Sequence, residues 1–129
     1  MRSEKLNYPQ ISKEDVKRGQ RAHAKKRARQ RYGLDLNRKD ILFIIQKIQE
    51  KEAIYLCQES RTRVHYILEF RDMWVIAVYD KGKKNIATFM PRSSFFDRYI
   101  KLISDKTYQD LEDQGVLNYL ENFKSSKGE

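Results

Sequence analysis

The sequence predicts an α+β fold, with two N-terminal helices packed on an antiparallel β-meander and a C-terminal helical appendage. Two periodicities support this prediction. Ile41, Ile44, Ile45 and Ile48 recur at the spacing of one helical face. Farther along, apolar and polar residues alternate over residues 62–70, with the period of two that is typical of a half-buried strand. The helical pattern precedes the strand pattern, so helices and strands are segregated along the chain.

Local signals indicate where the two N-terminal helices begin and end. Ser12 is expected to cap the first helix, which should end at Gly33, because a residue without Cβ suits the left-handed conformation there. Asn37 is expected to cap the second helix, with Asp40 as its capping-box partner. This second helix should end near Lys51.

Four strands are expected after the second helix. The run over residues 73–79 is almost entirely apolar, so it should be a central strand that is covered on both faces. Arg71 and Asp72 should form the tight turn before it, and residues 80–84 a hairpin loop that contains Gly82. Pro91 should end the last strand, because proline cannot donate a ladder hydrogen bond. The predicted strands are residues 53–58, 62–70, 73–79 and 85–90.

The chain beyond the last strand has a helical pattern again. Ser93 or Ser94 is suited to cap a segment that runs through Ile103, and Ser104 is suited to cap a last helix in which Gly115 is a potential break. We expect a single domain over residues 1–129, with a core at 12–91, a helical appendage at 92–121 and a frayed tail at 122–129.

Positive charge is concentrated at the start of the chain. The formal net charge is +9, and residues 1–31 supply +8 of it from eleven Lys or Arg and three acids. Such a field on one element predicts a polyanionic partner, and we expect RNA or another nucleic acid. Residues 105–121 instead carry five acids and one lysine. These acidic helices should repel phosphate, and they could dock on the core or on a protein partner.

Composition narrows the function classes. The longest apolar run, residues 41–45, is far shorter than the roughly 18 residues that a membrane span needs, so no membrane partner is expected. The first residues lack the apolar segment of a secretory signal, and the one cysteine, Cys57, fits a reducing compartment, so we expect a cytoplasmic protein. The five glycines form no phosphate-binding loop, and one cysteine with two histidines does not supply a zinc site. No cofactor and no metal are expected.

A histidine on the basic helix is the main candidate for chemistry. His23, Arg27 and Gln30 lie at i, i+4 and i+7 and share a face, with Arg31 beside them. RNA cleavage without a metal needs a group that takes the proton of the 2′-hydroxyl, a group that protonates the leaving 5′-oxygen, and positive charge near the phosphorane. An imidazole flanked by guanidinium groups suits these needs. Alternatively, His23 contacts phosphate or packs under the sheet and has no catalytic role.

Other residues complete the candidate site. Tyr79 and Thr88 could hydrogen-bond a scissile phosphate, although both are ordinary strand residues by propensity. His65 shares a strand face with Arg61 and Arg63 that could be solvent-facing, and it is a possible second acid or base. The cations expected to contact nucleic acid are Lys17, Arg18, Arg21, Lys25, Lys26, Arg29, Lys81 and Lys83.

The run from His23 to Leu34, followed by Val78-Tyr79-Asp80, Ile86-Ala87-Thr88 and Pro91, resembles small domains of the barnase/EndoU/colicin/RelE superfamily. The resemblance covers about residues 12–91 and implies a ribonuclease-like core that cleaves RNA by transesterification without a metal. By matching position, it makes His23 the acid or base, Arg27 and Arg31 the phosphate clamps, and Thr88 a site residue. The chain departs from the pattern because it lacks a convincing second histidine or a glutamate on the sheet face near this site, so only Tyr79, His65 or a lysine could complete the pair.

Two functions therefore fit the sequence. The first is a metal-independent endoribonuclease, toxin-like or directed at translation. The second is a catalytically inactive basic module of the same fold that binds nucleic acid or has a structural role, as in a virion. The two differ at His23, because binding needs the charge pattern of the helix and not the imidazole.

Overall fold

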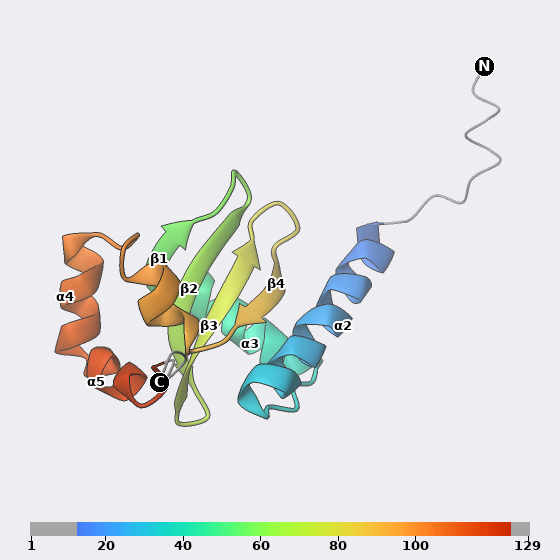
Figure 1. Cartoon of the computed structure of the whole chain (residues 1–129). Helices are drawn as coiled ribbons and strands as arrows, with labels where there is room; N and C mark the ends of the chain where they lie inside the picture. Colours follow the sequence, from blue (N-terminus) through green and yellow to red (C-terminus); the bar gives the residue numbers. More distant parts are fainter. Residues whose placement is uncertain (1–12, 125–129) are drawn as a thin grey trace, which may run out of the picture.

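The computed structural model describes the backbone of residues 13–124 and the side chains of residues 18–124. It has the α+β architecture that the sequence predicts (Figure 1). Ser12, the expected cap of the first helix, lies outside the described residues. The elements in chain order are α2 (Lys13–Tyr32), α3 (Arg38–Gln49), β1 (Ile54–Gln58), β2 (Arg63–Phe70), β3 (Met73–Asp80), β4 (Asn85–Met90), the π-helical turn η1 (Phe95–Tyr99), α4 (Asp105–Asp113) and α5 (Val116–Glu121).

The sheet is a meander of four antiparallel strands in the order β1-β2-β3-β4. The predicted turn between β2 and β3 is confirmed: Arg71 and Asp72 have φ angles of 51° and 63°, as a two-residue hairpin turn of type I′ requires. The prediction for β3 is also confirmed, since every residue from Val75 to Asp80 is buried. The strand is covered because a layer of helices lies on each face of the sheet.

The first helical layer consists of α2 and α3. The helix α2 runs along the edge strand β4, where its side chains Ala24 and Ala28 are completely buried (Figure 1). It ends as predicted at Gly33, which has a φ of +67° and whose N–H donates to the carbonyl of Arg29 at 3.0 Å. The Tyr32 hydroxyl donates to the carbonyl of Met90 at 2.5 Å, so the end of α2 is tied to β4.

The helix α3 follows the sequence prediction at its start and in its buried face. Asn37 and Asp40 form both hydrogen bonds of a capping box, each 2.9 Å long. The helix ends at Gln49, slightly before the predicted Lys51, which instead adopts a left-handed φ of 61° in the connection to β1. The four isoleucines at the predicted spacing, Ile41, Ile44, Ile45 and Ile48, are all buried against the sheet.

Residues 92–121 form the second helical layer, on the other face of the sheet. Phe95, Tyr99, Leu111, Val116 and Leu120 are completely buried there, and they pack against side chains of the sheet. The segment therefore docks on the core, one of the two roles that the sequence left open for it. Each face of the sheet therefore has its own buried apolar cluster, and both clusters stabilise the fold.

The predicted helix through Ile103 is wrong in form. Only the π-helical turn η1 is present, with the N–H of Ile100 donating to the carbonyl of Phe95 at 3.0 Å. This wider turn places Phe95 and Tyr99 together inside the core.

The predicted cap of the last helix at Ser104 and its predicted break at Gly115 are confirmed. The hydroxyl of Ser104 accepts from the N–H of Thr107, and Gly115, with a φ of +74°, separates α4 from α5. Over residues 13–124, none of the helices is both long and apolar enough to span a bilayer.

Candidate nucleic-acid interface

The cations of α2 stand on two flanks of a helix whose buried side is fixed. Successive residues are rotated by about 100° on a helix, so positions four apart stay on one side. Ala24 and Ala28 define the side that faces β4. One flank carries His23, Arg27 and Gln30, with Arg31 between it and the sheet. The other flank and the outer surface carry Arg18, Lys25, Lys26 and Arg29.

His23 is exposed on the first flank. Partial desolvation lowers the pKa of its imidazole, and the positive charges of Arg27, Lys26, Arg31 and Arg63 lower it further. The imidazole is thus neutral at neutral pH and can accept a proton or a hydrogen bond. Arg63 comes from β2, so a residue far away in the sequence adds its charge to this flank.

The two arginines near His23 differ in how much of their hydrogen bonding is already used. Arg27 donates to the side chain of Gln30 at 2.8 Å, on the exposed surface of the helix. Arg31 donates to the carbonyl of Phe89 on β4 at 2.7 Å, in a partly buried position. A guanidinium has five N–H donors, so both side chains retain donors for phosphate. Arg31, however, also holds α2 to the sheet edge.

A buried carboxylate fixes the N-terminal half of α2 and the position of Arg63. Asp80, at the end of β3, is only 3% exposed. Its carboxylate accepts from the side-chain amide of Gln20 at 3.2 Å and from the N–H of Lys83 at 3.1 Å. The Lys83 ammonium lies 3.7 Å away and the Arg63 Nε 4.0 Å away. Asp80 therefore joins α2, β2 and the β3–β4 turn at one point.

The electrostatics of Asp80 follow from these contacts. Burial alone would raise the pKa of the Asp80 carboxyl, but the hydrogen bonds from the Lys83 N–H and from Gln20, together with the Lys83 charge, outweigh it and lower the pKa.

Gly82 of the β3–β4 turn leaves room for these contacts, because a Cβ there would lie 3.3 Å from Asp80 Oδ1. The left-handed residue of the turn is Lys84, with a φ of 51°, and not the glycine.

The outer surface of α2 forms a shallow groove of about 440 Å³ lined by Ala22, Lys25, Lys26, Arg29 and Gln30. Among the residues that the structure describes, Lys25 and Lys26 form no ion pair. Arg29 pairs with Asp35, its Nε donating at 2.7 Å, but both side chains are about three-quarters exposed. Such a pair contributes little to stability and can be exchanged for a phosphate contact. Of the remaining predicted cations, Arg18 and Arg21 also lie on α2, and the side chain of Lys17 is outside the described residues.

The structure separates the two candidate residues of the sheet. Thr88 pairs across the ladder with Val78 and is half-buried on the face that also carries Arg63 and Asp80. Tyr79 follows Val78, so its side chain points to the opposite face. There it packs with α3, and its hydroxyl accepts from the amide of Gln49 at 3.1 Å. Thr88 is thus on the same side as the His23 flank, and Tyr79 is not.

His65 is buried, so it does not take the solvent-facing position that the sequence left open for it. Only 1% of the residue is exposed, because Tyr99 of the second helical layer covers it. Nε2 lies 2.7 Å from a Glu59 oxygen, and Nδ1 lies 2.6 Å from the Tyr99 hydroxyl. An ionised carboxylate only accepts, so Nε2 carries the proton and Nδ1 accepts from Tyr99. Burial lowers the pKa of His65, although the hydrogen bond and the charge of Glu59 partly oppose the shift.

The lysines of the β3–β4 turn are exposed, and they lie next to different neighbours. Lys83 contacts Asp80 beside α2, whereas Lys81 lines a cleft on the α3 side of the sheet. Over residues 18–124, no three side chains of His, Cys, Asp or Glu are grouped so that they could hold a metal ion.

Three residues of this interface could not be found from the sequence: Gln20, Arg63 and Asp80. Each is an ordinary residue type for its place in the sequence, so nothing in the sequence singles it out. Only the packing of α2 against the end of the sheet brings the three together.

Comparisons with models of protein families, with curated proteins and with solved structures found no match to this chain. The resemblance to the barnase/EndoU/colicin/RelE superfamily stays a prediction.

Proposed function

We propose that this protein is an RNA-binding domain in which α2 contacts the phosphate backbone. The observation that carries the proposal is the geometry of α2. Ala24, Ala28 and Tyr32 fix one side of the helix on β4, and cations occupy the other sides. A positive surface on a rigid element loses little conformational freedom when it binds a polyanion.

Charge on both flanks favours a strand or loop that wraps the helix. On one flank, Arg27 and Arg31 stand beside His23, and Arg63 adds charge from β2. On the outer surface, Lys25 and Lys26 are available for phosphate. RNA is proposed over DNA for two reasons. The superfamily resemblance implies it, and the 2′-hydroxyl gives a neutral imidazole at His23 a donor that DNA lacks.

Charge reversal on the outer surface of α2 tests this proposal. The triple variant Lys25→Glu, Lys26→Glu and Arg29→Glu changes the net charge by six and spares Arg31, which holds α2 to Phe89. A matched control, Arg38→Glu, Lys39→Glu and Lys101→Glu, makes the same change at exposed positions outside α2. The α2 variant should lose RNA binding while the control loses much less. Equal losses in the two variants would show that net charge alone attracts RNA.

The salt dependence of binding gives a second readout of the same proposal. Each phosphate contact releases condensed counterions, so about five contacts should lower the affinity on the order of a hundredfold between about 50 and about 200 mM salt. The α2 charge-reversal variant should show a flatter dependence than the wild type. An unchanged slope in that variant would locate the phosphate contacts elsewhere.

A second candidate function is metal-independent RNA cleavage at His23. The observation that favours it is the exposure of His23 together with the lowered pKa of its imidazole, which leaves a neutral base beside Arg27. In such a reaction, His23 would take the proton of the 2′-hydroxyl, the 2′-oxygen would attack the adjacent phosphorus, and the bond to the leaving 5′-oxygen would break. Since His65 is buried and Tyr79 faces the other side of the sheet, a lysine or water would protonate the leaving oxygen, and slow turnover is expected.

A further inference from the structure

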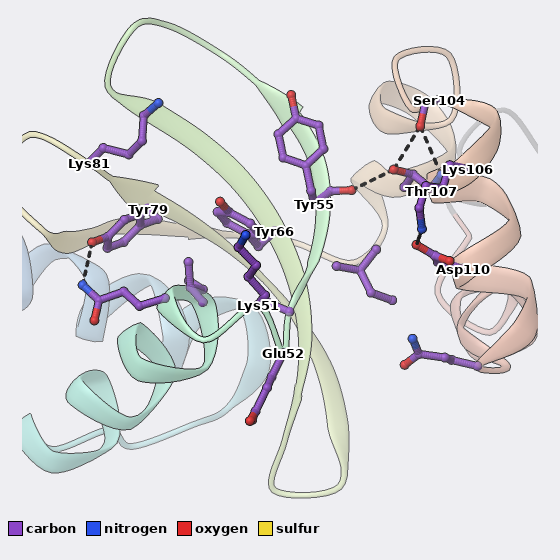
Figure 2. Close-up of a pocket in the computed structure, with 15 residues that line it drawn as sticks. Lys51, Glu52, Tyr55, Tyr66, Tyr79, Lys81, Ser104, Lys106, Thr107 and Asp110 are labelled. Carbon is purple, nitrogen blue, oxygen red and sulfur yellow. Dashed lines mark hydrogen bonds and ion pairs between the residues drawn. The ribbon is translucent and has the colours of Figure 1, made fainter.

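A cleft of about 800 Å³ opens on the α3 side of the sheet (Figure 2), and none of the residues that line it belongs to the His23 flank. It lies between the end of α3, the first three strands and α4. The helix α3 covers the other end of this sheet face, and α4 is fixed to the β1 edge by the Thr107 hydroxyl, which donates to the Tyr55 carbonyl at 3.1 Å. The cleft remains open because neither helix covers the strand ends between them.

Three tyrosines line the cleft, one from each of the strands β1, β2 and β3: Tyr55, Tyr66 and Tyr79. Tyr55 and Tyr66 are cross-strand partners, and their ring centroids are 6.1 Å apart with the planes at 79°. Tyr55 is 46% exposed, Tyr66 is half-buried and Tyr79 is 7% exposed. The exposure of the three rings therefore decreases from Tyr55 to Tyr79, and Figure 2 shows how the rings lie on the three strands. A single exposed tyrosine is common on a sheet. Three tyrosines that line one cleft instead form an aromatic surface on which a ligand can bind.

Lysines surround these rings. Lys51 stands on the connection from α3 to β1, Lys81 on the β3–β4 turn and Lys106 on α4. Lys106 pairs with Asp110 at 3.0 Å, whereas within the described part of the chain Lys51 and Lys81 form no ion pair. Glu52 and Asp110 also lie on the rim, so the cleft combines ring faces with separate cations and is not uniformly positive.

We propose that this cleft binds unstacked bases of single-stranded RNA. Tyr55 and Tyr66 supply the stacking surface, and Lys51 and Lys81 contact the flanking phosphates. A base in a duplex hides its ring faces in the stack, so only a single strand, loop or end can use such a surface. Every base has a ring face, so recognition here tolerates different sequences. The inference rests on the proposed RNA binding by α2 and names the part of the RNA that this second surface takes.

The β3–β4 turn connects the two surfaces. Lys83 contacts Asp80, which also holds Gln20 of α2, and Lys81, two residues earlier, lines the tyrosine cleft. A single strand that leaves the phosphate contacts of α2 can follow this turn into the cleft. The turn thus carries one cation beside α2, Lys83, and one beside the cleft, Lys81. Since both lysines can contact phosphates of one strand, they favour RNA over an apolar peptide as the occupant.

Substitution of the most exposed ring tests the proposal. Tyr55→Ala should weaken binding of a short single-stranded oligouridylate by about 5-fold to about 100-fold, the usual contribution of one stacked base. Tyr55→Phe keeps the ring and should bind nearly as the wild type does. Tyr108→Ala, at a tyrosine of similar exposure that lies on α4 outside the cleft, is the matched control and should have no effect. Binding to a blunt RNA duplex should be the same in all three variants.

Ultraviolet cross-linking to the oligouridylate, followed by mass spectrometry, locates the contact independently of affinity. Cross-links should map to Tyr55 or Tyr66. The proposal is overturned if Tyr55→Ala binds the single strand as the wild type does and no cross-link falls in the cleft. If at the same time the α2 charge reversal abolishes binding, the proposed function of α2 stands without the cleft. A proline-rich peptide that perturbs the Tyr55 and Tyr66 NMR signals, with no such effect from the oligonucleotide, would also overturn it.

Discussion

The imidazole of His65 and the hydroxyl of Tyr99 are 2.6 Å apart inside the protein, and this contact joins the sheet to the C-terminal helical layer. Tyr99 is completely buried in η1, and His65 is buried on β2. The other imidazole nitrogen reaches Glu59 on the connection between β1 and β2. A carboxylate, an imidazole and a phenol thus form one connected chain, so the His65 ring has a partner at both nitrogens.

Removing the phenol oxygen should destabilise the protein without changing its fold. Tyr99→Phe leaves Nδ1 of His65 buried with no donor, which costs about 1 to 3 kcal/mol. Ring packing against Phe95 remains, so the loss can be assigned to the hydrogen bond. Chemical denaturation of the variant and the wild type measures the difference. Equal stability of the two proteins would show that the contact contributes nothing net.

Stability should fall as the pH is lowered from about 7 to about 5. The unfolded state binds protons more readily at His65, because burial lowers the pKa of this residue in the folded state. Its contribution is therefore complete above its unfolded pKa of about 6.5 and is lost as the pH falls below that value. The lowered pKa of Glu59 acts in the same direction at a lower pH. Thermal unfolding across this range measures the effect.

The matched comparison is between two histidine variants. His65→Gln should be less stable than the wild type at neutral pH and should show a flatter decline on acidification, because the titrating group is gone. The fold also lowers the pKa of His23, but this imidazole is exposed, so His23→Gln should flatten the decline less than His65→Gln does. If His65→Gln keeps the full decline between about pH 7 and about pH 5, other groups are responsible.

Asp80 is expected to be the most sensitive polar position of the interface. Asp80→Asn keeps the shape of the side chain but removes the charge that faces Lys83 and Arg63. Loss of a hydrogen-bonded charge in this position should cost about 1.5 to 3 kcal/mol. Gln20→Ala removes one neutral donor to the same carboxylate and should cost about 1 kcal/mol or less. A double-mutant cycle of these two positions should give a non-additive result, because they share one contact.

Removal of residues 92–129 should prevent stable folding. Truncation after Pro91 exposes the sheet face that Phe95, Tyr99 and Leu111 cover, and it leaves β3 with only one helical layer. We expect an aggregated or unfolded product by circular dichroism and gel filtration. A truncated chain that is monomeric and as stable as the full chain would show that residues 12–91 fold on their own.

The catalytic candidate is tested at His23. If the protein cleaves RNA, His23→Ala should lower the rate by about a hundredfold or more, while RNA affinity changes by less than about tenfold. Cleavage should persist in EDTA and leave 2′,3′-cyclic phosphate ends, because the attacking group is the 2′-hydroxyl of the RNA. The wild type should be assayed with total RNA beside the variant. Absence of cleavage by the wild type would leave the binding function alone, and cleavage that needs an added divalent metal would refute this mechanism.

Much of the architecture follows from local patterns in the sequence. Residues that are close in the sequence decide the isoleucine face of α3, the capping box of Asn37 and Asp40, and the left-handed conformations of Gly33 and Gly115. The strands and the Arg71-Asp72 turn follow from side-chain alternation and turn geometry in the same way. The charge of α2 is equally local, so the basic surface of this helix could be predicted from the sequence, while its role in binding stays a prediction.

The sequence by itself determined the α+β order of elements, the ends of most of them and the basic surface of α2, since these depend on residues that are close in the chain. Only the tertiary structure decided which distant residues meet. It placed Arg63 beside the His23 flank through Asp80, buried His65 under Tyr99, put Tyr79 and Thr88 on opposite faces, and left a row of tyrosines open between α3 and α4. These outcomes depend on how two helical layers pack on one sheet, and periodicity along the chain does not determine which distant side chains such packing brings together.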